Sequence, residues 1–247
     1  PSSAASDVYK RQHVTFGYGE RYVLKDFSMT VKQGEQVTLV GRTGAGKSTV
    51  FKLLLGLYQP EAGTVTIGGV KVGDITDRER RTCIGCVEQH FSRVPGTVLE
   101  QITLGDPQIT GEMAKDAAAL AGIDAAIRAL PEGYDTVLSD TGGALSAGQR
   151  QLLCIARVML RLPPMLILDE ATSSIDTRTE AIVQRGMDQL MEGRTVFVIA
   201  HRLSTVKNSD VIMVLDHGRI IERGSHEKLI AEKGTYYQLY TGAFELE

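Results

Sequence analysis

The chain has 247 residues, of which 43% are hydrophobic and 23% are charged, and its formal net charge at pH 7 is -3. This composition is that of an ordinary globular protein, and it fits neither a disordered, a collagen-like nor a disulfide-scaffold chain. The slightly negative charge provides no basic field for DNA or RNA, so no nucleic-acid partner is expected. The longest apolar runs, such as residues 196–200, are far shorter than the roughly 18 residues that span a bilayer, so no transmembrane segment is predicted here.

Residues 1–12 contain few apolar residues and show no periodicity. We therefore expect them to be a disordered tail or a cloning-derived segment, outside a folded domain of residues 13–247. Apolar alternation then predicts three strands, at residues 14–16, 23–31 and 36–40. The third strand runs into a glycine-rich turn, after which a helix is predicted from about residue 47 to residue 57.

Further strands and turns are predicted over residues 56–69 and 70–75, and another strand at residues 82–88. The last of them contains Cys83 and Cys86, and Cys154 follows later. An odd number of cysteines argues for a reducing compartment with free thiols. Cys83 and Cys86 have the spacing of a redox or metal motif, but no second Cys pair or His pair accompanies them. A packing role is therefore favoured over a metal site.

The middle of the chain is rich in alanine with helical periodicity, as at residues 112–121 and 125–130, and it predicts a helical lobe over about residues 90–162. Strands and helices alternate after it: helices are predicted at 146–160, 175–191 and 227–240, and strands at 165–169, 195–200, 211–215 and 219–222. This alternation predicts an α/β fold with a parallel sheet flanked by helices.

The glycine-rich segment after the third strand has the spacing of a phosphate loop (Walker A): glycine, four residues, then Gly-Lys-Ser. Its backbone N–H groups can wrap phosphate oxygens, the following helix directs its positive end at them, and Ser48 can ligate Mg²⁺. A glycine turn that only packs tightly is the alternative, but the strand before and the helix after favour the loop. We therefore predict a site for ATP and Mg²⁺ at Gly41, Arg42, Thr43, Gly44, Ala45, Gly46, Lys47, Ser48 and Thr49.

The apolar strand at residues 165–168 ends in Asp169 and Glu170. The carboxyl edge of a parallel sheet would place both acids beside the phosphate loop. One carboxylate can hold Mg²⁺ while its neighbour orients or deprotonates water. Taken alone, acids at this point would more often cap a helix. Together with the phosphate loop and its Lys47, Asp169 and Glu170 therefore predict one metal ligand and one group that acts on water.

A second short motif identifies a family. Leu145-Ser146-Ala147-Gly148-Gln149, followed by Arg150-Gln151, resembles the signature motif of ATP-binding cassette (ABC) ATPases. The resemblance covers about residues 13–244. It implies a P-loop NTPase core with a parallel sheet flanked by helices, an N-terminal antiparallel β subdomain, and a helical subdomain that carries the signature.

Four other residues stand where this family places functional ones. The resemblance implies that Tyr18 stacks on adenine, that Gln89 meets the metal and couples to a transmembrane partner, and that His201 contacts the γ-phosphate. Asp176, in Ser174-Ile175-Asp176, resembles the loop that crosses the dimer. Taken alone, Tyr18 would be an ordinary exposed strand aromatic, and Gln89 and His201 would be unremarkable polar residues at strand ends.

The signature explains why such domains work in pairs. Ser146, Ala147, Gly148 and Gln149 open a helix whose positive end can bind an anion. By family analogy this anion is the γ-phosphate of ATP held by the opposite subunit, so that two head-to-tail domains enclose two nucleotides. Hydrolysis would follow from Glu170 polarising a water in line with the γ-phosphate, and dimer closure would drive transport.

Several strings resemble exporters in which the membrane and ATPase parts share one polypeptide, among them residues 95–102, 104–107, 130–135 and 199–205. This implies a transmembrane domain, fused upstream, and a place at the cytoplasmic face of the cell membrane. Two positions depart from the pattern. Residues 138–142 replace the usual Val-Gly-Glu-Arg-Gly, and Ala147 replaces the commonest glycine, where a Cβ can obstruct close approach or a left-handed backbone.

Ala147 suggests a heterodimer, in which this chain supplies one active nucleotide face and its altered signature serves a weaker site on a non-identical partner. The alternative is that alanine is small enough to be tolerated. Two other classes of function also compete with the exporter motor. A soluble ABC ATPase of DNA repair or translation would carry insertions, tandem cassettes or basic faces, and a regulatory module that does not hydrolyse ATP would not need Glu170 and His201.

Overall fold

The computed structural model describes residues 7–19, 21–88, 94–138, 144–169, 177–200 and 203–242. The chain forms two compact units. The first consists of residues 1–84, 164–170 and 193–247, and the second of residues 85–163 and 171–192. Among the described residues, no helix is long and apolar enough to span a bilayer.

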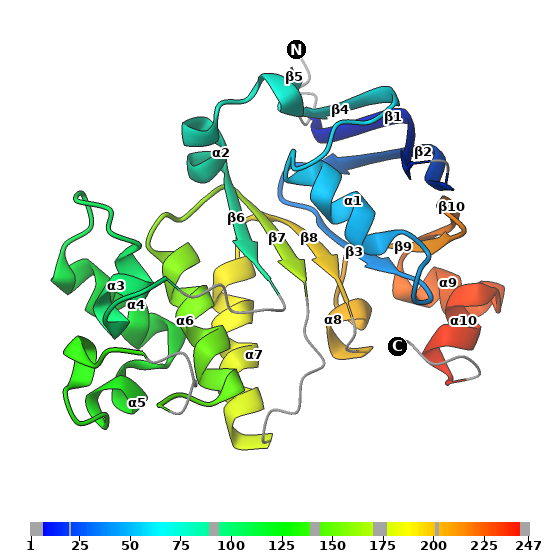
Figure 1. The fold of residues 1–247 in the computed structure, drawn as a ribbon. Coiled ribbons are helices and arrows are strands. Elements are labelled where there is room, and N and C mark those ends of the chain that lie inside the picture. The colour runs from blue at the N-terminus through cyan, green and yellow to red at the C-terminus, as the bar shows by residue number, and fades with distance from the viewer. Residues whose placement is uncertain are drawn as a thin grey trace, which may run out of the picture. The chain divides into compact units, whose positions relative to one another are not determined.

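The first unit contains a small antiparallel sheet at its N-terminal side (Figure 1). Its strands follow the order β2-β1-β4-β5, with bounds β1 Asp7–Tyr18, β2 Arg21–Lys32, β4 Ala62–Ile67 and β5 Val70–Lys71. Apolar side chains on alternate positions of β2 are buried, as expected of a strand with one face on a core. The expected N-terminal antiparallel β subdomain is therefore present.

The first strand begins earlier than the sequence predicted. Residues 7–12, which belong to the predicted tail of residues 1–12, form the first half of β1. Tyr9 pairs with Val31 of β2 on one side and with Ile67 of β4 on the other. Backbone pairing with two neighbouring strands holds this segment, and it requires no apolar alternation in the segment itself.

A larger sheet forms the core of the first unit. Its strands there follow the order β10-β9-β3-β8-β7, with bounds β3 Gln36–Val40, β7 Met165–Asp169, β8 Thr195–Ile199, β9 Val211–Asp216 and β10 Arg219–Gly224. The strands β9, β3, β8 and β7 are parallel, and β10 is antiparallel to β9. The parallel strands are buried along almost their whole length, as both faces of a parallel sheet usually are.

The helices of the first unit are α1 Lys47–Leu54, the 3₁₀ turn η1 Val72–Asp74, α2 Asp77–Cys83, α8 Leu203–Lys207, α9 His226–Glu232 and α10 Thr235–Tyr240. Two of them correct the sequence prediction. The strand expected to start at residue 82 is preceded by α2, which a capping box between Thr76 and Glu79 opens. The single helix expected at 227–240 is divided, because the Glu222 carboxylate accepts the N–H groups of Thr235 and Tyr236 and so starts a new helix.

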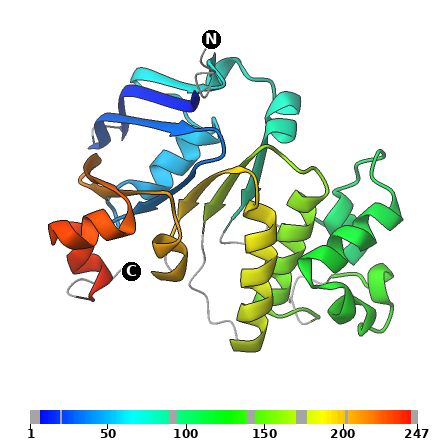
Figure 2. The ribbon, with the colours of Figure 1, turned by 180° about the vertical axis from the view of Figure 1, so that it is seen from behind.

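The second unit is mainly helical (Figure 2). Its helices are α3 Val98–Thr103, α4 Gly111–Ala121, α5 Asp124–Arg128, the 3₁₀ turn η2 Gly133–Asp135, α6 Ala147–Met159 and α7 Thr177–Met191. Helix α6 packs against both α4 and α7. Strand β6 (Ile84–Val87) is the point at which the chain passes from the first unit into the second.

The boundaries of this helical unit differ from the predicted lobe of about residues 90–162. The unit starts at Gly85 and ends its first segment at Pro163, and residues 171–192 with α7 also belong to it. The reason is packing: α7 packs against α6 and α4 of this unit, and Val183 and Leu190 of α7 are buried. The periodicity of the α7 segment alone does not indicate which helices α7 packs against.

Candidate functional site

The phosphate loop follows directly after β3 and leads into α1. Strand β3 lies between two parallel neighbours, so its carboxyl end delivers the loop to the edge where the other parallel strands also end. Gly46 has φ +112°, a conformation that L side chains rarely adopt. A Cβ on Gly41 would collide with the carbonyl oxygen of Leu215. The glycines are thus required by the shape of the loop and by what packs against it.

The N-terminus of α1 presents N–H groups that no side chain caps. The N-cap is Gly46, which has no side chain to accept them, and the first turn contains no acidic residue. The first N–H groups of any helix lack partners inside the helix. An anion is the natural acceptor for such a donor set. The residues of this loop therefore fit the phosphates of a nucleotide.

Lys47 lies against the same loop. Its ammonium Nζ donates to the carbonyl oxygens of Gly41 (2.5 Å) and Arg42 (3.2 Å). Only 9% of the residue is exposed. Burial lowers the pKa of Lys47 below its usual range, and the negative charge of Asp169 acts in the opposite direction. The side chain is thus a cation held inside the loop, near a carboxylate from another strand.

Asp169 is the last residue of β7 and pairs in register with Ile199 at the end of β8. The structure therefore brings Asp169 and Lys47 together, as the sequence predicted for the carboxyl edge of the sheet. Ser48, the second residue of α1, is exposed. A hydroxyl and a carboxylate beside a phosphate site are the oxygen donors that Mg²⁺ prefers. The donor set therefore fits this metal ion.

Tyr18 ends β1 and is 45% exposed. Its ring meets Phe16 edge to face at a centroid distance of 5.1 Å and Tyr58 at 5.7 Å. Lys52 of α1 lies 5.8 Å from the centre of the Tyr58 ring. An aromatic ring held by two others while almost half exposed can present a flat apolar surface to a base.

The signature residues lie in the second unit, at the start of α6. Ser146 is the N-cap: its hydroxyl accepts the Gln149 N–H (3.2 Å), and the Gln149 Oε1 accepts the Ser146 N–H (2.8 Å). Ala147 is the first helical residue and has no positive φ. Of the two effects that a Cβ could have here, obstruction of a left-handed backbone therefore does not apply, because the residue is helical. Obstruction of close approach to a phosphate stays a prediction.

Four predicted site residues lie outside the described residues, namely Gln89, Glu170, Asp176 and His201. Their roles stay predictions. The described strand ends bear on two of them, because β7 ends at Asp169 and β8 at Ile199, and these ends are neighbours in the parallel register. In the sequence, Glu170 is the next residue after β7, and His201 is the second residue after β8.

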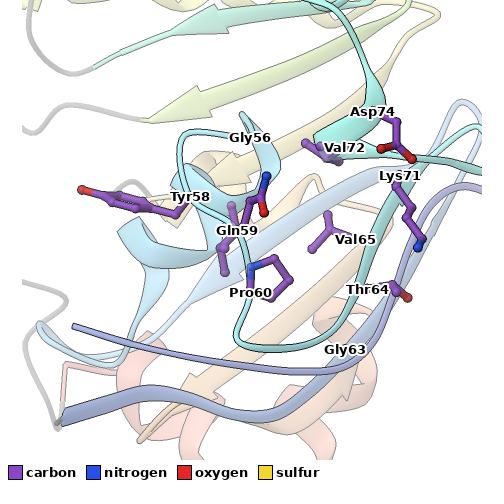
Figure 3. A pocket seen from close by; sticks show the side chains of 12 residues that line it. Gly56, Tyr58, Gln59, Pro60, Gly63, Thr64, Val65, Lys71, Val72 and Asp74 are labelled. Atoms are coloured by element: carbon purple, nitrogen blue, oxygen red, sulfur yellow. The ribbon is translucent and has the colours of Figure 1, made fainter. Parts of the chain in front are cut away.

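The cysteines and one pocket lie outside the predicted nucleotide site. Cys83 is exposed at the end of α2 and Cys154 is buried in α6, and none of the three cysteines, all within the described ranges, forms a disulfide. Within the described ranges, no cluster of three His, Cys, Asp or Glu residues could hold a metal ion. A pocket of about 250 Å³ has Tyr58, Lys71 and Asp74 among its lining residues (Figure 3). Its lining includes none of the predicted site residues that the structure describes.

Sequence reasoning did not single out Leu215 and Gly218, which touch the phosphate loop. Gly218 donates its N–H to the carbonyl oxygen of Ala45 (3.0 Å). The two residues between the strand ends Asp216 and Arg219 do carry the signal of a tight hairpin turn. That signal predicts the turn itself, but it does not indicate what the turn contacts.

Comparison with known proteins places this chain among ABC transporter domains. The family model described as "ABC transporter" matches residues 24–173. The chain is 44% identical over 229 residues to a protein named "Fatty acid ABC transporter ATP-binding/permease protein" from Mycobacterium bovis, covering 92% of this chain and 36% of that protein. It is also 44% identical over 228 residues to "Probable multidrug resistance ABC transporter ATP-binding/permease protein YheH" from Bacillus subtilis, covering 92% and 34%.

Among solved structures, the chain is similar to a bacterial Atm1-family ABC exporter with ATP bound. The TM-score is 0.87 at 37% sequence identity, and the match covers 98% of this chain and 42% of that chain. The chain thus spans little more than a third of the curated relatives described above.

Proposed function

This chain belongs to the ABC transporter family, and from that premise we propose that it is the ATP-binding and ATP-hydrolysing domain of an exporter. It would power transport of a substrate across a membrane through ATP-driven dimerisation. The observation that carries the proposal is the uncapped N-terminus of α1, with Lys47 held in the loop beside Asp169. The names of the relatives, which combine ATP-binding and permease parts, support the exporter assignment.

In the proposed complex, Tyr18 stacks on adenine and the N–H groups of residues 41–49 bind the phosphates. Lys47 exchanges its contacts with the loop carbonyls for contacts with β- and γ-phosphate oxygens. Such charge-assisted hydrogen bonds are the strong ones in proteins. Ser48, Asp169 and Gln89 would hold Mg²⁺, which supplies positive charge to the phosphate oxygens when it is bound.

For hydrolysis, Glu170 would orient a water in line with the γ-phosphate and accept its proton. Lys47 and His201 would stabilise the charge that spreads over the γ-phosphate oxygens. A single positioned donor of this kind is worth about 10²–10³ in rate. Glu170 would thus activate the water, and His201, two positions after the end of β8, would stabilise charge.

A second subunit would complete the site. Ser146 retains its hydroxyl hydrogen after accepting from Gln149, and can donate it to the γ-phosphate of ATP held by a partner domain. Ala147 and Gly148 would approach the same phosphate through their N–H groups, and Asp176 would contact the partner across the head-to-tail dimer. We propose that the partner is non-identical, since the Ala147 Cβ would weaken the site that this signature serves.

The proposal includes a transmembrane domain fused upstream and a position at the cytoplasmic face of the cell membrane. The fused architecture named for the relatives supports both statements and does not favour a soluble ABC ATPase. Sequencing upstream of residue 1 tests them: six long apolar segments are expected. A stop codon directly upstream would contradict a fused exporter.

The direct test of hydrolysis is phosphate release from MgATP by the purified chain, alone and mixed with candidate partner domains. The Glu170→Gln variant is expected to bind ATP and to lose about two to three orders of magnitude in turnover, because water is no longer activated. An unchanged rate in this variant would contradict the assigned role of Glu170. Robust turnover by the homodimer, abolished by Glu170→Gln, would contradict the need for a non-identical partner.

A further inference from the structure

The turn between β9 and β10 contacts the phosphate loop from outside the motif. Asp216 and Arg219 pair across it, and His217 and Gly218 are its two central residues. Both have positive φ, +45° for His217 and +78° for Gly218. Two consecutive positive φ values are typical of the tight turn that joins two antiparallel strands.

The backbone of Gly218 forms hydrogen bonds to the phosphate loop and to β2. Its N–H donates to the Ala45 carbonyl inside the phosphate loop (3.0 Å), and its carbonyl accepts the Lys25 N–H from β2 (3.2 Å). A Cβ on Gly218 would collide with the carbonyl oxygen of Val23. The turn therefore fits between the loop and β2 only because this residue has no side chain.

Strands β9 and β2 also contact the phosphate loop, one at each end of it. Gly41 packs on the carbonyl of Leu215, just before the turn, and Gly46 lies against Val23 and Leu24 of β2. Strand β2 forms a hairpin with β1, in which Tyr18 pairs with Arg21. A continuous path of backbone contacts thus leads from the phosphate loop through Gly218 to the hairpin that carries Tyr18.

We propose that the β9–β10 turn is a positioning element of the nucleotide site, with Gly218 as its central residue. It fixes the phosphate loop against β2 and thereby sets the spacing between the Tyr18 ring and the phosphate-binding N–H groups. One ATP molecule must contact the Tyr18 ring with its adenine and these N–H groups with its phosphates, so the spacing decides how well a triphosphate binds. The inference rests on the proposed binding of ATP by this chain.

The test compares Gly218→Ala with Gly69→Ala in the 247-residue chain. Gly69 lies in the β4–β5 turn at φ +83°, and a Cβ there meets nothing within 4 Å. Both substitutions therefore impose a similar backbone strain, but only Gly218→Ala also forces the loop and β2 apart. Displacement of N-methylanthraniloyl-ATP by unlabelled ATP and by AMP gives the two affinities. AMP lacks the β- and γ-phosphates, so it depends less on the loop.

We expect Gly218→Ala to weaken ATP binding about tenfold or more, because a displacement of about 1 Å is already costly in a site of fixed geometry. AMP binding should change much less, and Gly69→Ala should leave both affinities near those of the wild type. A loss of folded protein alone would lower the amplitude of both titrations and leave the ratio of ATP to AMP affinity unchanged. A wild-type ratio in folded Gly218→Ala overturns the inference.

Hydrogen exchange of the wild-type chain decides the matter if Gly218→Ala does not fold. MgATP should slow exchange in a peptide that covers residues 211–220 as well as in one that covers the phosphate loop. Slower exchange in the loop peptide alone overturns the positioning role while ATP binding stands. No displacement of the labelled nucleotide by ATP in the wild type would instead refute the proposed function.

Discussion

Helices α1 and α6 both begin where a phosphate group is expected, and their first turns are built differently. Helix α1 follows Gly46, and no side chain accepts from its first N–H groups. Helix α6 follows Ser146, and its Gln149 N–H is already bonded to the serine hydroxyl. Neither first turn carries an acidic residue that would repel an anion.

The difference indicates how much each site can do alone. The donors at α1 are main-chain groups that glycine leaves uncapped, and Lys47 adds a buried positive charge. The donors at α6 are partly used by the helix itself, so less remains for an anion. We therefore expect α1 to bind a nucleotide within one chain, whereas α6 contributes only after a partner has brought a phosphate to it.

Lys47→Ala should have the largest effect, because it removes the charge on which the α1 site depends. Loss of charge-assisted bonds is expected to weaken ATP binding about a hundredfold, equivalent to about 2.8 kcal/mol. Titration with N-methylanthraniloyl-ATP measures this affinity. Lys32→Ala, at an exposed lysine of β2, is the control and should bind as the wild type does. Equal ATP affinities of the wild type, Lys47→Ala and Lys32→Ala would show that the α1 site does not depend on the charge of Lys47.

Ser146→Ala should distinguish the role of α6 from that of α1. It is expected to lower phosphate release about tenfold or more, because a donor to the γ-phosphate is lost, while ATP binding to the single chain changes little. The loss of a serine cap also costs about 1 kcal/mol of stability.

Ser225→Ala is the matched control for that cost. Ser225 caps α9, and its hydroxyl accepts the Lys228 N–H at 3.3 Å, much as Ser146 does at α6. Both variants should therefore lose similar stability in urea unfolding, but only Ser146→Ala should lose turnover. If phosphate release falls equally in both, the signature has no special part in the reaction.

Ala147→Gly should have a smaller effect of opposite sign. Removal of the Cβ allows closer approach of the first N–H groups of α6 to a phosphate, so homodimer turnover should rise about two- to fivefold, or less than 1 kcal/mol. Ala125→Gly, at an exposed position of α5, controls for the general cost of glycine in a helix. Unchanged turnover would mean that alanine is tolerated, and the heterodimer hypothesis would lose its motivation.

The comparison also shows which parts of the molecule the sequence could predict. The segment from β3 through the phosphate loop to α1 is set by local rules, because the glycine spacing, Lys47 and the flanking elements all lie within residues 36–54. Asp169 was predicted from the apolar strand it ends, together with the rule that parallel strands share an edge. These are short-range patterns, and the structure agrees with them.

Features that depend on distant partners were missed. Residues 7–12 are held by pairing with β2 and β4. The start of α10 is set by Glu222, which lies 13 residues before Thr235. The contact of Gly218 with the phosphate loop joins residues more than 170 positions apart. Periodicity within a segment carries no information on such contacts, although the capping box of α2 was a local signal that could have been recognised.

The smallest expected effect is a dependence on pH, which should arise at the N-terminus of α1 and not at that of α6. Lys47 titrates, whereas Ser146 and Gln149 carry no titrating group in this range. Burial lowers the pKa of Lys47, so the unfolded chain binds more protons than the folded one as pH approaches the ordinary lysine pKa. The free energy of unfolding should therefore rise with pH over that interval.

ATP affinity should fall over the same interval, because the triphosphate favours the protonated ammonium and its binding must then take up a proton. Lys47→Met should abolish both trends, since its side chain is similar in length and does not titrate. Urea unfolding and N-methylanthraniloyl-ATP titration, repeated at several pH values from neutral upward, measure the two slopes. Parallel slopes in the wild type and in Lys47→Met would show that another group, and not the lysine at α1, controls the pH dependence.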